Sequence, residues 1–343
     1  MSIQIINPLE YPHWDDMLHT CGRATFFHTS AWARVLIESY RYEPLYFTIF
    51  ENGKLGGLIP VMEIKSILTG KRGISLPFTD MCDPVAGTAE TFNRLIKDLA
   101  AYGRQAGWRH FEIRGGNIFF PNDPFFAEHF VHSLELASDE AEVRKNFKSN
   151  TRRNIRKAVN EGVTVTLERS RGAVAEFYKL HCGTRRHHGL PPQPWSFFVK
   201  IHEHVISAGM GFVALARYRG RCIAGAVYTL YRDGAIYKYG ASNRDSQRLR
   251  ANNLVMWEAI RWLIGNGFRS LHFGRTELTS DGLLQFKRGW GVAEGRLNYY
   301  KYDFKRNRFA ARKAGTKTSY DVFRILPMPI LRLTGSLLYR HVA

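Results

Sequence analysis

The sequence predicts an α/β protein built from two related domains. Segments with strand-like and helix-like patterns alternate along the 343 residues, as they do in α/β architectures. The same layout occurs twice: helices, a hairpin, a further strand, a helix after it and then a buried strand. A chain of this length also suits two domains, since one domain usually takes about 100–200 residues. We therefore expect one domain over 1–137, a second over 138–306 and a helical tail over 307–343.

Local signals define the elements of the first domain. Asn52-Gly53 separates two β-rich runs, and this dipeptide is the strongest short signal for a β-hairpin. Ser30 can cap a helix, and apolar residues at helical spacing predict a later helix that Gly107 ends. The expected elements are, in order, a strand at 3–6, a helix at 31–39, hairpin strands at 45–51 and 54–64, a strand at 74–77, a helix at 91–106 and a strand at 110–114.

The second domain begins at Ser138-Asp139-Glu140, a helix start with acidic residues in its first turn. Gly162 and Gly267 each follow a helical pattern and end it. The expected elements are, in order, a helix from 138 to 162 with a break near 149–150, a strand at 163–167, helices at 173–187 and 195–207, a hairpin at 211–218 and 222–231, a strand at 235–241, a helix at 252–266, a strand at 270–273, a short helix at 282–288 and a strand at 296–304.

Charge and composition narrow the class of protein. The formal net charge of +19 attracts polyanions such as nucleic acid, anionic lipid or phosphorylated substrates. No compact recognition module is present, so we expect no sequence-specific DNA binding. The four cysteines form no C-x-x-C pair, which argues against a zinc ribbon or redox motif. The first ten residues lack a secretory pattern and no long apolar window occurs, so we expect a cytoplasmic protein.

The tail differs in composition from the two domains. Arg308, Arg312, Lys313 and Lys317 precede an apolar stretch that prolines interrupt. One interpretation is that 318–340 forms an amphipathic segment that contacts anionic lipid, which places the protein peripherally on the inner face of the cell membrane. The other is a helix docked on the body of the protein.

Three segments of the second half carry a recognisable pattern. Residues 237–242 read Tyr-Lys-Tyr-Gly-Ala-Ser, 271–276 read Leu-His-Phe-Gly-Arg-Thr, and 283–291 read Leu-Leu-Gln-Phe-Lys-Arg-Gly-Trp-Gly. They resemble the C-terminal half of Fem-type (FemAB-like), GNAT-like acyltransferases, in particular members associated with exosortase (PEP-CTERM) and exopolysaccharide systems. Segments at 27–32, 56–60, 75–80, 150–158 and 184–191 resemble that family in the same order.

The resemblance implies two tandem GNAT-like domains with mixed, mostly antiparallel sheets. It implies transfer of an acyl group to an amine of a cell-envelope or exopolysaccharide precursor, a phosphorylated or pyrophosphate-linked small molecule. Acyl-CoA is the expected co-substrate, with no permanently bound cofactor or metal. Two alternatives stay open: an aminoacyl-tRNA-dependent enzyme that builds peptidoglycan cross-bridges, and a non-catalytic scaffold that binds polyanions or membranes.

Candidate site residues cluster in the matching segments. The resemblance places Lys287 at the catalytic centre, where its ammonium can stabilise negative charge on the acyl carbonyl, and we expect Trp290 beside it to contribute to donor binding. Arg275 follows a predicted buried strand and can clamp a phosphate or carboxylate. Tyr237 and Tyr239 alternate on one strand, so we expect both to face the same side, where one protonates the leaving group. Core packing is the alternative for the tyrosines.

Residues 244–253 precede the expected helix at 252–266, and phosphates favour helix N-termini. In GNAT enzymes this is a glycine-rich pyrophosphate loop, but here it has no glycine. We expect Arg248 and Arg250 to compensate with charge and Asn252 to contribute to donor binding. The lack of glycine counts against CoA and keeps tRNA open as the donor.

A second basic feature lies at the start of the second domain. Arg152 and Arg156 are four apart and share one helical face. Arg144 and Lys148 extend them into a stripe if the helix is continuous. Such a stripe suits tRNA or a pyrophosphate-linked lipid, although a solvated helix face is the alternative.

Asp80 follows an expected strand of the first domain. The resemblance places it in the acceptor cleft, where it can accept the proton of the amine, and simple turn chemistry is the alternative. Five histidines between 181 and 204 lack the paired spacing of zinc sites, so we expect no metal.

Overall fold

The computed structural model describes residues 3–312 and 321–342. Contacts within the chain divide it into two compact units. Unit 1 comprises Met1–His129, Arg296–Thr316 and Leu337–Ala343, and unit 2 comprises Phe130–Gly295 and Lys317–Ser336. The chain enters unit 2 along strand β7 (Ala127–Glu135) and returns to unit 1 along β13 (Ala293–Asp303). Each unit therefore contains segments from separate parts of the chain. The domains expected from the sequence, 1–137 and 138–306, are each contiguous.

Unit 1 contains a mixed sheet with one parallel pair, β4 with β6. The strand order is β1 (Ile3–Ile6), β2 (Glu43–Glu51), β3 (Lys54–Ser66), β4 (Gly70–Ile74), β6 (His110–Arg114) and β13. The short strands β5 (Val85–Ala86) and β14 (Arg308–Phe309) pair with β3 and β13. The predicted hairpin is confirmed: Asn52 and Gly53 take φ values of 52° and 76° between β2 and β3, the left-handed geometry that a tight two-residue turn requires.

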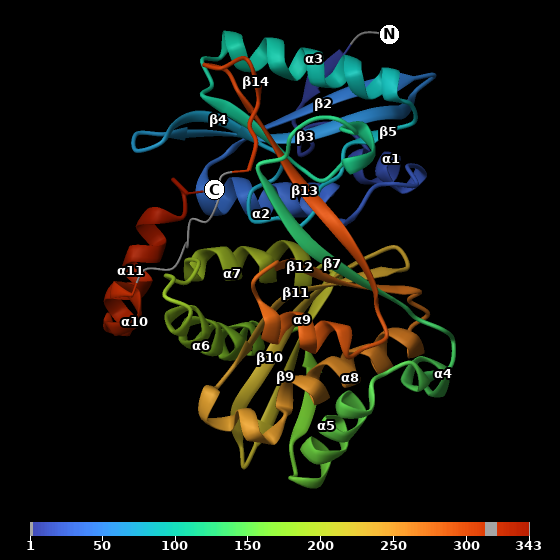
Figure 1. Ribbon diagram of the computed structural model, residues 1–343, viewed down its shortest axis with the longest axis vertical. Coiled ribbons are helices and arrows are strands. Elements are labelled where there is room, and N and C mark those ends of the chain that lie inside the picture. Colours follow the sequence, from blue (N-terminus) through green and yellow to red (C-terminus); the bar gives the residue numbers. More distant parts are fainter. Residues whose placement is uncertain (1–2, 313–320, 343) are drawn as a thin grey trace. The chain divides into compact units, whose positions relative to one another are not determined.

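Helices cover the unit 1 sheet (Figure 1). Helix α3 (Ala89–Gln105) confirms the predicted amphipathic helix, since Phe92, Leu95 and Leu99 are buried against β2 and β3. Helices α1 (Trp14–Thr20) and α2 (Ser30–Tyr40) complete the unit. The cap of α2 is Thr29, whose hydroxyl accepts from the Trp32 N–H, so the prediction of Ser30 as cap is wrong.

The strand predicted at 74–77 is also wrong. Strand β4 ends at Ile74, and the backbone then turns into left-handed conformations at Leu76 (φ 50°) and Phe78 (φ 59°). Such conformations are uncommon for bulky residues. They bring the following loop under Arg114, whose guanidinium donates to the Leu76 carbonyl over 3.4 Å.

Unit 2 contains a second run of paired strands. Its strand order is β7, β12 (Ser270–Glu277), β11 (Gly234–Ser242), β10 (Arg221–Tyr231), β9 (Gly211–Tyr218) and β8 (Thr164–Glu168). Strands β8 to β11 are antiparallel neighbours, whereas β11 and β12 run parallel. The hairpin of β9 and β10 confirms its prediction; β7 was not predicted.

Helices pack on both faces of the unit 2 sheet (Figure 1). Helices α5 (Ser149–Asn160) and α8 (Ala251–Gly265) share a core with Phe212 and Tyr228 of the strands. Gly225 of β10 faces the other way, toward Phe177 of α6 (Arg171–His187), which α7 (Trp195–Ile201) accompanies. The helix expected from 138 to 162 is broken earlier than predicted, into α4 (Glu140–Lys145) and α5.

The remaining elements are α9 (Asp281–Arg288) after β12, and two tail helices, α10 (Val322–Ile325) and α11 (Met328–Leu338). Lys313 and Lys317 of the predicted basic stretch, and 318–320 of the predicted membrane segment, lie outside the described residues. Among the helices that the structure describes, none is long and apolar enough to cross a membrane.

Candidate functional site

The parallel strands β11 and β12 separate after a short paired stretch. Their register pairs Gly234 with Ser270 through to Ile236 with His272. Past these pairs β11 continues to Ser242 and β12 to Glu277. Backbone N–H and C=O groups need partners even where a ladder ends. The two continuing stretches, 237–242 and 273–277, therefore offer backbone groups to side chains or a ligand, and we call this feature the β11–β12 opening.

Lys287 lies beside this opening. It is the penultimate residue of α9 and only 2% exposed. Its Nζ donates to the carbonyl oxygens of Gly274 (3.0 Å) and Arg275 (3.1 Å) on β12. Gly274 has a φ of 68°, a conformation that glycine adopts without strain. These hydrogen bonds hold the buried Lys287 ammonium against β12, at residues beyond its pairing with β11.

Arg275 is adjacent to Lys287, because its own carbonyl accepts from the lysine. The two predicted site residues are therefore in contact through the Arg275 backbone, not through its guanidinium. The next residue, Thr276, is buried, and its hydroxyl has no hydrogen-bond partner among the described residues. Buried hydroxyls are normally paired, so Thr276 Oγ1 is a polar atom of β12 that a ligand can pair. Sequence reasoning missed it because a single threonine in a strand carries no distinctive pattern.

The two tyrosines of β11 face opposite sides of the sheet, so the prediction of a shared face is wrong. The register with β10 pairs Val227 with Tyr239 and Tyr228 with Tyr237, which leaves Lys238 as an extra residue. Such a bulge reverses the alternation of side chains. Tyr237 contacts the ring of Tyr228 at 5.6 Å on the α8 side.

Tyr239 lies on the α6 and α7 side, where its ring centroid is 5.8 Å from that of His181 and 5.5 Å from that of Phe198. This aromatic environment matches the core-packing alternative. Tyr237, in contrast, contacts β12 itself, since its ring centroid is 6.4 Å from that of Phe273. Of the two predicted proton donors, Tyr237 is therefore the one associated with the strand that holds Lys287.

The Tyr237 hydroxyl lies over Gly240. A Cβ atom at position 240 would lie 1.7 Å from that oxygen, so only glycine admits the present tyrosine position. Burial raises the pKa of Tyr237 to about 12. The hydroxyl therefore keeps its proton at neutral pH and can act as a proton donor. Sequence reasoning did not identify Gly240, since its role depends on the bulge.

The expected donor loop forms a 3₁₀ turn, η4 (Arg244–Leu249), and α8 begins two residues later at Ala251. Arg250 joins them in a left-handed conformation, with a φ of 59°. Arg248, Arg250 and Asn252 are all exposed at this helix start. The turn thus forms without glycine, and it presents two guanidinium groups at the positive end of the α8 dipole.

The basic stripe of α5 is shorter than proposed, because Arg144 and Lys148 lie outside this helix. The Arg144 guanidinium stacks 5.7 Å from the Trp257 ring. Arg152 donates to the Lys145 carbonyl over 3.1 Å. Arg144, Lys145 and Arg152 line an open groove of about 790 Å³. Arg156 is exposed and lines a neighbouring groove of about 410 Å³.

Trp290 is fully enclosed. Its ring packs edge-on against Phe147 at 4.9 Å and Phe286 at 5.9 Å. A donor could reach the indole only if those rings moved. The burial therefore indicates that Trp290 has a structural role rather than a role in donor binding. Its neighbour Gly289 lies so close to Thr151 of α5 that a Cβ would stand 2.4 Å from the threonine hydroxyl.

Asp80 is half-buried in unit 1, and its backbone carbonyl accepts from the Tyr299 hydroxyl. Lys287 belongs to unit 2. The proposed action of Asp80 on the acceptor amine stays a prediction.

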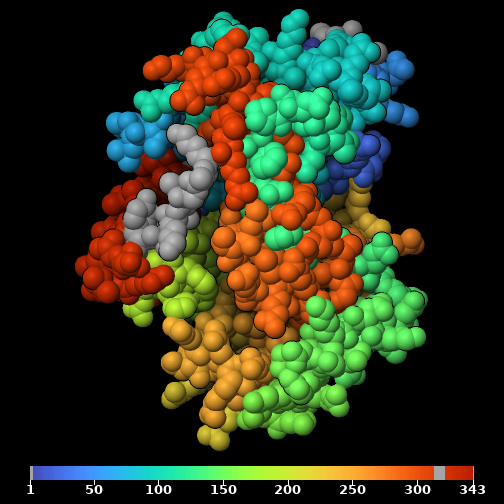
Figure 2. Space-filling model, viewed as in Figure 1, coloured from blue at the N-terminus to red at the C-terminus, as the bar shows by residue number. Residues whose placement is uncertain are grey.

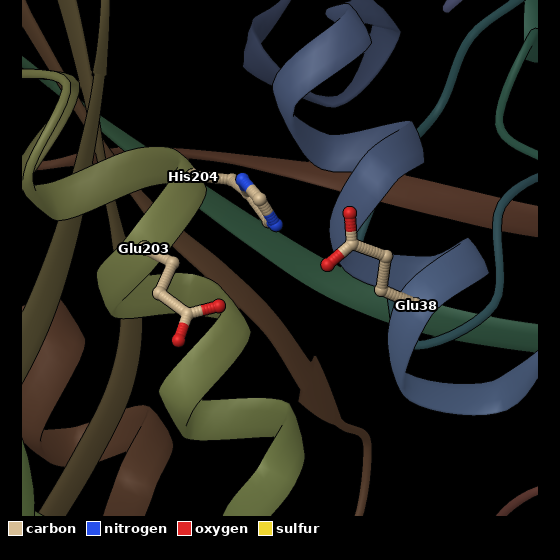
Figure 3. Close-up of side chains that lie close together, drawn as sticks. All are labelled: Glu38, Glu203 and His204. Carbon is tan, nitrogen blue, oxygen red and sulfur yellow. The ribbon is translucent and has the colours of Figure 1, made fainter.

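Of the five histidines between 181 and 204, His181 lies in the core of unit 2. His181 is buried, its Nε2 lies 2.7 Å from Gln193 Oε1, and burial lowers its pKa to about 3. Figure 3 shows Glu203 and His204 of the π-helical turn η3 (His202–Ile206) with Glu38 of α2. Glu38 belongs to unit 1 and the other two to unit 2, so this group defines no metal site within either unit.

Comparison with known proteins adds the family context. Residues 145–288 match the model of the acetyltransferase (GNAT) domain. The solved structure of FemX is 14% identical, with a TM-score of 0.70 over 89% of this chain and 98% of that chain. A tandem GNAT protein from the clavulanic acid biosynthesis pathway is 9% identical, with a TM-score of 0.55 over 88% and 98%.

The C-terminal domain of a putative lysylphosphatidylglycerol synthetase from Agrobacterium fabrum is 15% identical, with a TM-score of 0.54 over 83% of this chain and 88% of that chain. No curated protein sequence matches the chain. The structural matches establish the fold, a tandem GNAT arrangement. The segment that matches the GNAT domain model, residues 145–288, contains β11, β12, α8 and Lys287.

Proposed function

We propose that the chain is an N-acyltransferase that moves an acyl group from acyl-CoA to an amine of a phosphorylated or pyrophosphate-linked envelope or exopolysaccharide precursor. The observation that carries the proposal is the buried Lys287 ammonium, held by two β12 carbonyls beside the β11–β12 opening. A fixed charge of this kind needs no reorganisation during reaction and acts strongly in a water-poor setting.

The proposed reaction forms a C–N bond and breaks a C–S bond. The neutral amine attacks the thioester carbonyl, and the carbonyl oxygen becomes an oxyanion that the Lys287 ammonium stabilises. Collapse of this intermediate expels the thiolate. The Tyr237 hydroxyl gives its proton to the sulfur, and the proton released by the amine restores the tyrosine. The products are an amide and a free thiol.

Donor phosphates have a matching surface in the same unit. Arg248 and Arg250 are exposed at the start of α8, where the helix dipole and first-turn N–H groups favour anions. The same features suit the phosphates of a tRNA. The glycine-free loop 244–253 favours this second candidate, an aminoacyl-tRNA-dependent enzyme that builds peptidoglycan cross-bridges. The net charge of +19 agrees with an anionic partner in both cases.

A donor screen on the full chain tests the proposal. Thermal unfolding is measured with acetyl-CoA, with a long-chain acyl-CoA and with aminoacyl-tRNA. A ligand at about 100 times its Kd adds roughly 2.7 kcal/mol of stability, so the true donor class gives a clear upward shift. The stabilising donor is then incubated with a panel of amino sugars and peptidyl amines, and amide products are detected by mass spectrometry with and without RNase.

Lys287→Met provides the specific variant, because methionine keeps the apolar stem and removes the ammonium. We expect amide formation to fall about 100- to 1000-fold, while the exposed Lys157→Met on α5 retains full activity. Full turnover by folded Lys287→Met protein rules out the assigned centre. If no donor stabilises the chain, the non-catalytic scaffold is the better description.

A further inference from the structure

Helix α11 exposes an apolar stripe. Ile330, Leu333 and Leu337 recur at three- and four-residue spacing, which places them on one helical face, and Leu333 is 60% exposed. The other side is fixed: Leu331 is fully buried, and Gly335 lies so close to the Pro192 carbonyl that a Cβ would be 2.0 Å from its oxygen. The helix cannot roll to hide the stripe.

Helix α10 adds to this apolar surface. Val322 is exposed, and Ile325 is 82% exposed. Figure 2 shows α10 and α11, in red, at the surface of the molecule. Isolated exposed hydrophobic side chains are ordinary, but here five occur on two consecutive short helices.

A second apolar element lies in unit 1, at the turn between β3 and β4. Ile67 is 95% exposed and Leu68 is 65% exposed. This hairpin tip is tied to the chain's C-terminal segment, because His341 Nδ1 lies 3.0 Å from Ser66 Oγ and the His341 carbonyl accepts from Thr69 Oγ1 over 3.0 Å. The next residue, Val342, is again exposed.

Together these segments hold most of the exposed large hydrophobic side chains of the described chain. Eight of twelve belong to them: Ile67, Leu68, Val322, Ile325, Ile330, Leu333, Leu337 and Val342. The others, Ile5, Ile118, Val159 and Leu283, are carried by four separate elements. Within each of these segments, several neighbouring exposed apolar side chains mark an interaction site rather than scattered exposure.

Positive charge accompanies the apolar side chains. Arg324, Arg332 and Arg340 alternate with them along the tail, and all three are exposed, although Arg324 also pairs with Asp321 and Arg332 lies over the Tyr178 ring. Lys71, beside the hairpin tip, is also exposed, whereas Lys65 on the other side is already paired with Glu43 and Glu63. Apolar side chains with adjacent Lys and Arg bind the interface of bilayers that contain anionic lipid, since the chains enter the acyl boundary while the cations meet the headgroups.

We propose that the chain docks on anionic membranes through α10 and α11, and that the β3–β4 hairpin tip of unit 1 supplies a further membrane contact. Each segment binds in the plane of the interface. The proposal is independent of the acyl-transfer chemistry, because no residue of the β11–β12 opening takes part in it.

Vesicle flotation with the full chain tests this proposal. We expect binding to phosphatidylcholine vesicles that contain phosphatidylglycerol, weaker binding as salt screens the headgroups, and little binding to phosphatidylcholine alone. Leu333→Asp and Ile67→Asp should each lower the partition coefficient about tenfold or more. Ile118→Asp is the matched control, because Ile118 is equally an exposed isoleucine but lies on η2 (Asn117–Phe119), and it should bind as the wild type does.

Thermal melts identify any variant that fails to fold, and exposed sites of this kind usually change stability little. The proposal is overturned if the wild type ignores anionic vesicles, or if both aspartate variants bind as the wild type does. It is equally overturned if the wild type is a dimer in solution that Leu333→Asp separates without any vesicle binding, since the apolar stripe then belongs to a second copy.

Discussion

Gly240→Ala tests whether the Tyr237 hydroxyl takes part in the reaction. The added Cβ would stand 1.7 Å from the tyrosine oxygen and 2.7 Å from Cζ. Real Cβ contacts remain above 3.0 Å, so the hydroxyl must retreat by at least 3.0 − 1.7 = 1.3 Å. The ring has little room to do so, because it packs between Tyr228 and Phe273.

The expected magnitudes follow from this displacement. Overpacking of a fixed ring costs about 1–3 kcal/mol of the free energy of unfolding. A proton donor that moves by more than 1 Å loses its alignment, and positioned proton transfer contributes about 100-fold or more to rate. In Tyr237→Phe the oxygen is gone, and the ring needs to move by only 3.0 − 2.7 = 0.3 Å to accept a methyl group at position 240.

A double-mutant cycle separates the two effects. We expect Gly240→Ala and Tyr237→Phe to lower kcat/KM similarly, by about 100-fold, and the double variant to be no worse than either. Rates are measured as thiol release from the donor identified by the screen, with urea unfolding as the check on stability. If the activity losses multiply instead, the two substitutions act at different points, and the assignment of Tyr237 as proton donor fails.

Three further predictions concern stability and the donor loop. Burial alone would raise the pKa of Glu112, but the hydrogen bond from His110 and nearby cations hold it at about 2. The ionised carboxylate therefore contributes about 3 kcal/mol to the free energy of unfolding above pH 4.5, and this contribution is lost as the pH falls toward 2. In Glu112→Gln, the urea midpoint should depend less on pH across this range. Gly335→Val should clash with the Pro192 carbonyl and release α11, which limited proteolysis detects as faster cleavage of the tail with an unchanged core. Arg250→Gly keeps the left-handed turn but removes a charge, so donor affinity should fall and lose part of its salt dependence; an unchanged Kd excludes Arg250 from donor binding.

The elements that were predicted correctly are those whose structure is determined by the residues within them. The Asn52-Gly53 turn forms because both residues tolerate left-handed backbone, whatever lies around them. Helix α3 follows from its own apolar spacing. Strand β7 was missed because it carries His129 and His132 at buried positions, so its inward side does not look apolar. Burial of polar residues depends on tertiary partners, such as Glu294, 2.9 Å from His132 Nε2.

The site shows the same division between local and tertiary causes. Lys287 was predicted from a dense motif, and the structure pairs it with Arg275 through the latter's backbone carbonyl. The tyrosine pair was predicted from ideal alternation, which fails at Lys238 because the bulge exists only in the pairing with β10. Thr276 has no local signal, since its significance is that its hydroxyl is buried without a partner among the described residues.

Arg250 takes the left-handed backbone position that a glycine of the expected donor loop would suit, and it adds a positive charge there. The lack of glycine in 244–253 counted against close backbone approach to CoA phosphates, and the left-handed position before α8 is taken by Arg250 itself. That conformation costs a non-glycine residue about 1–2 kcal/mol, and the Arg250 N–H offsets part of the cost by donating to the Gln247 carbonyl over 3.1 Å. Where glycine would leave bare backbone, this loop adds a guanidinium at the positive end of a helix. Binding at such a loop rests on side-chain charge, so any phosphate-bearing donor held there should be more sensitive to salt than one cradled by backbone N–H groups alone.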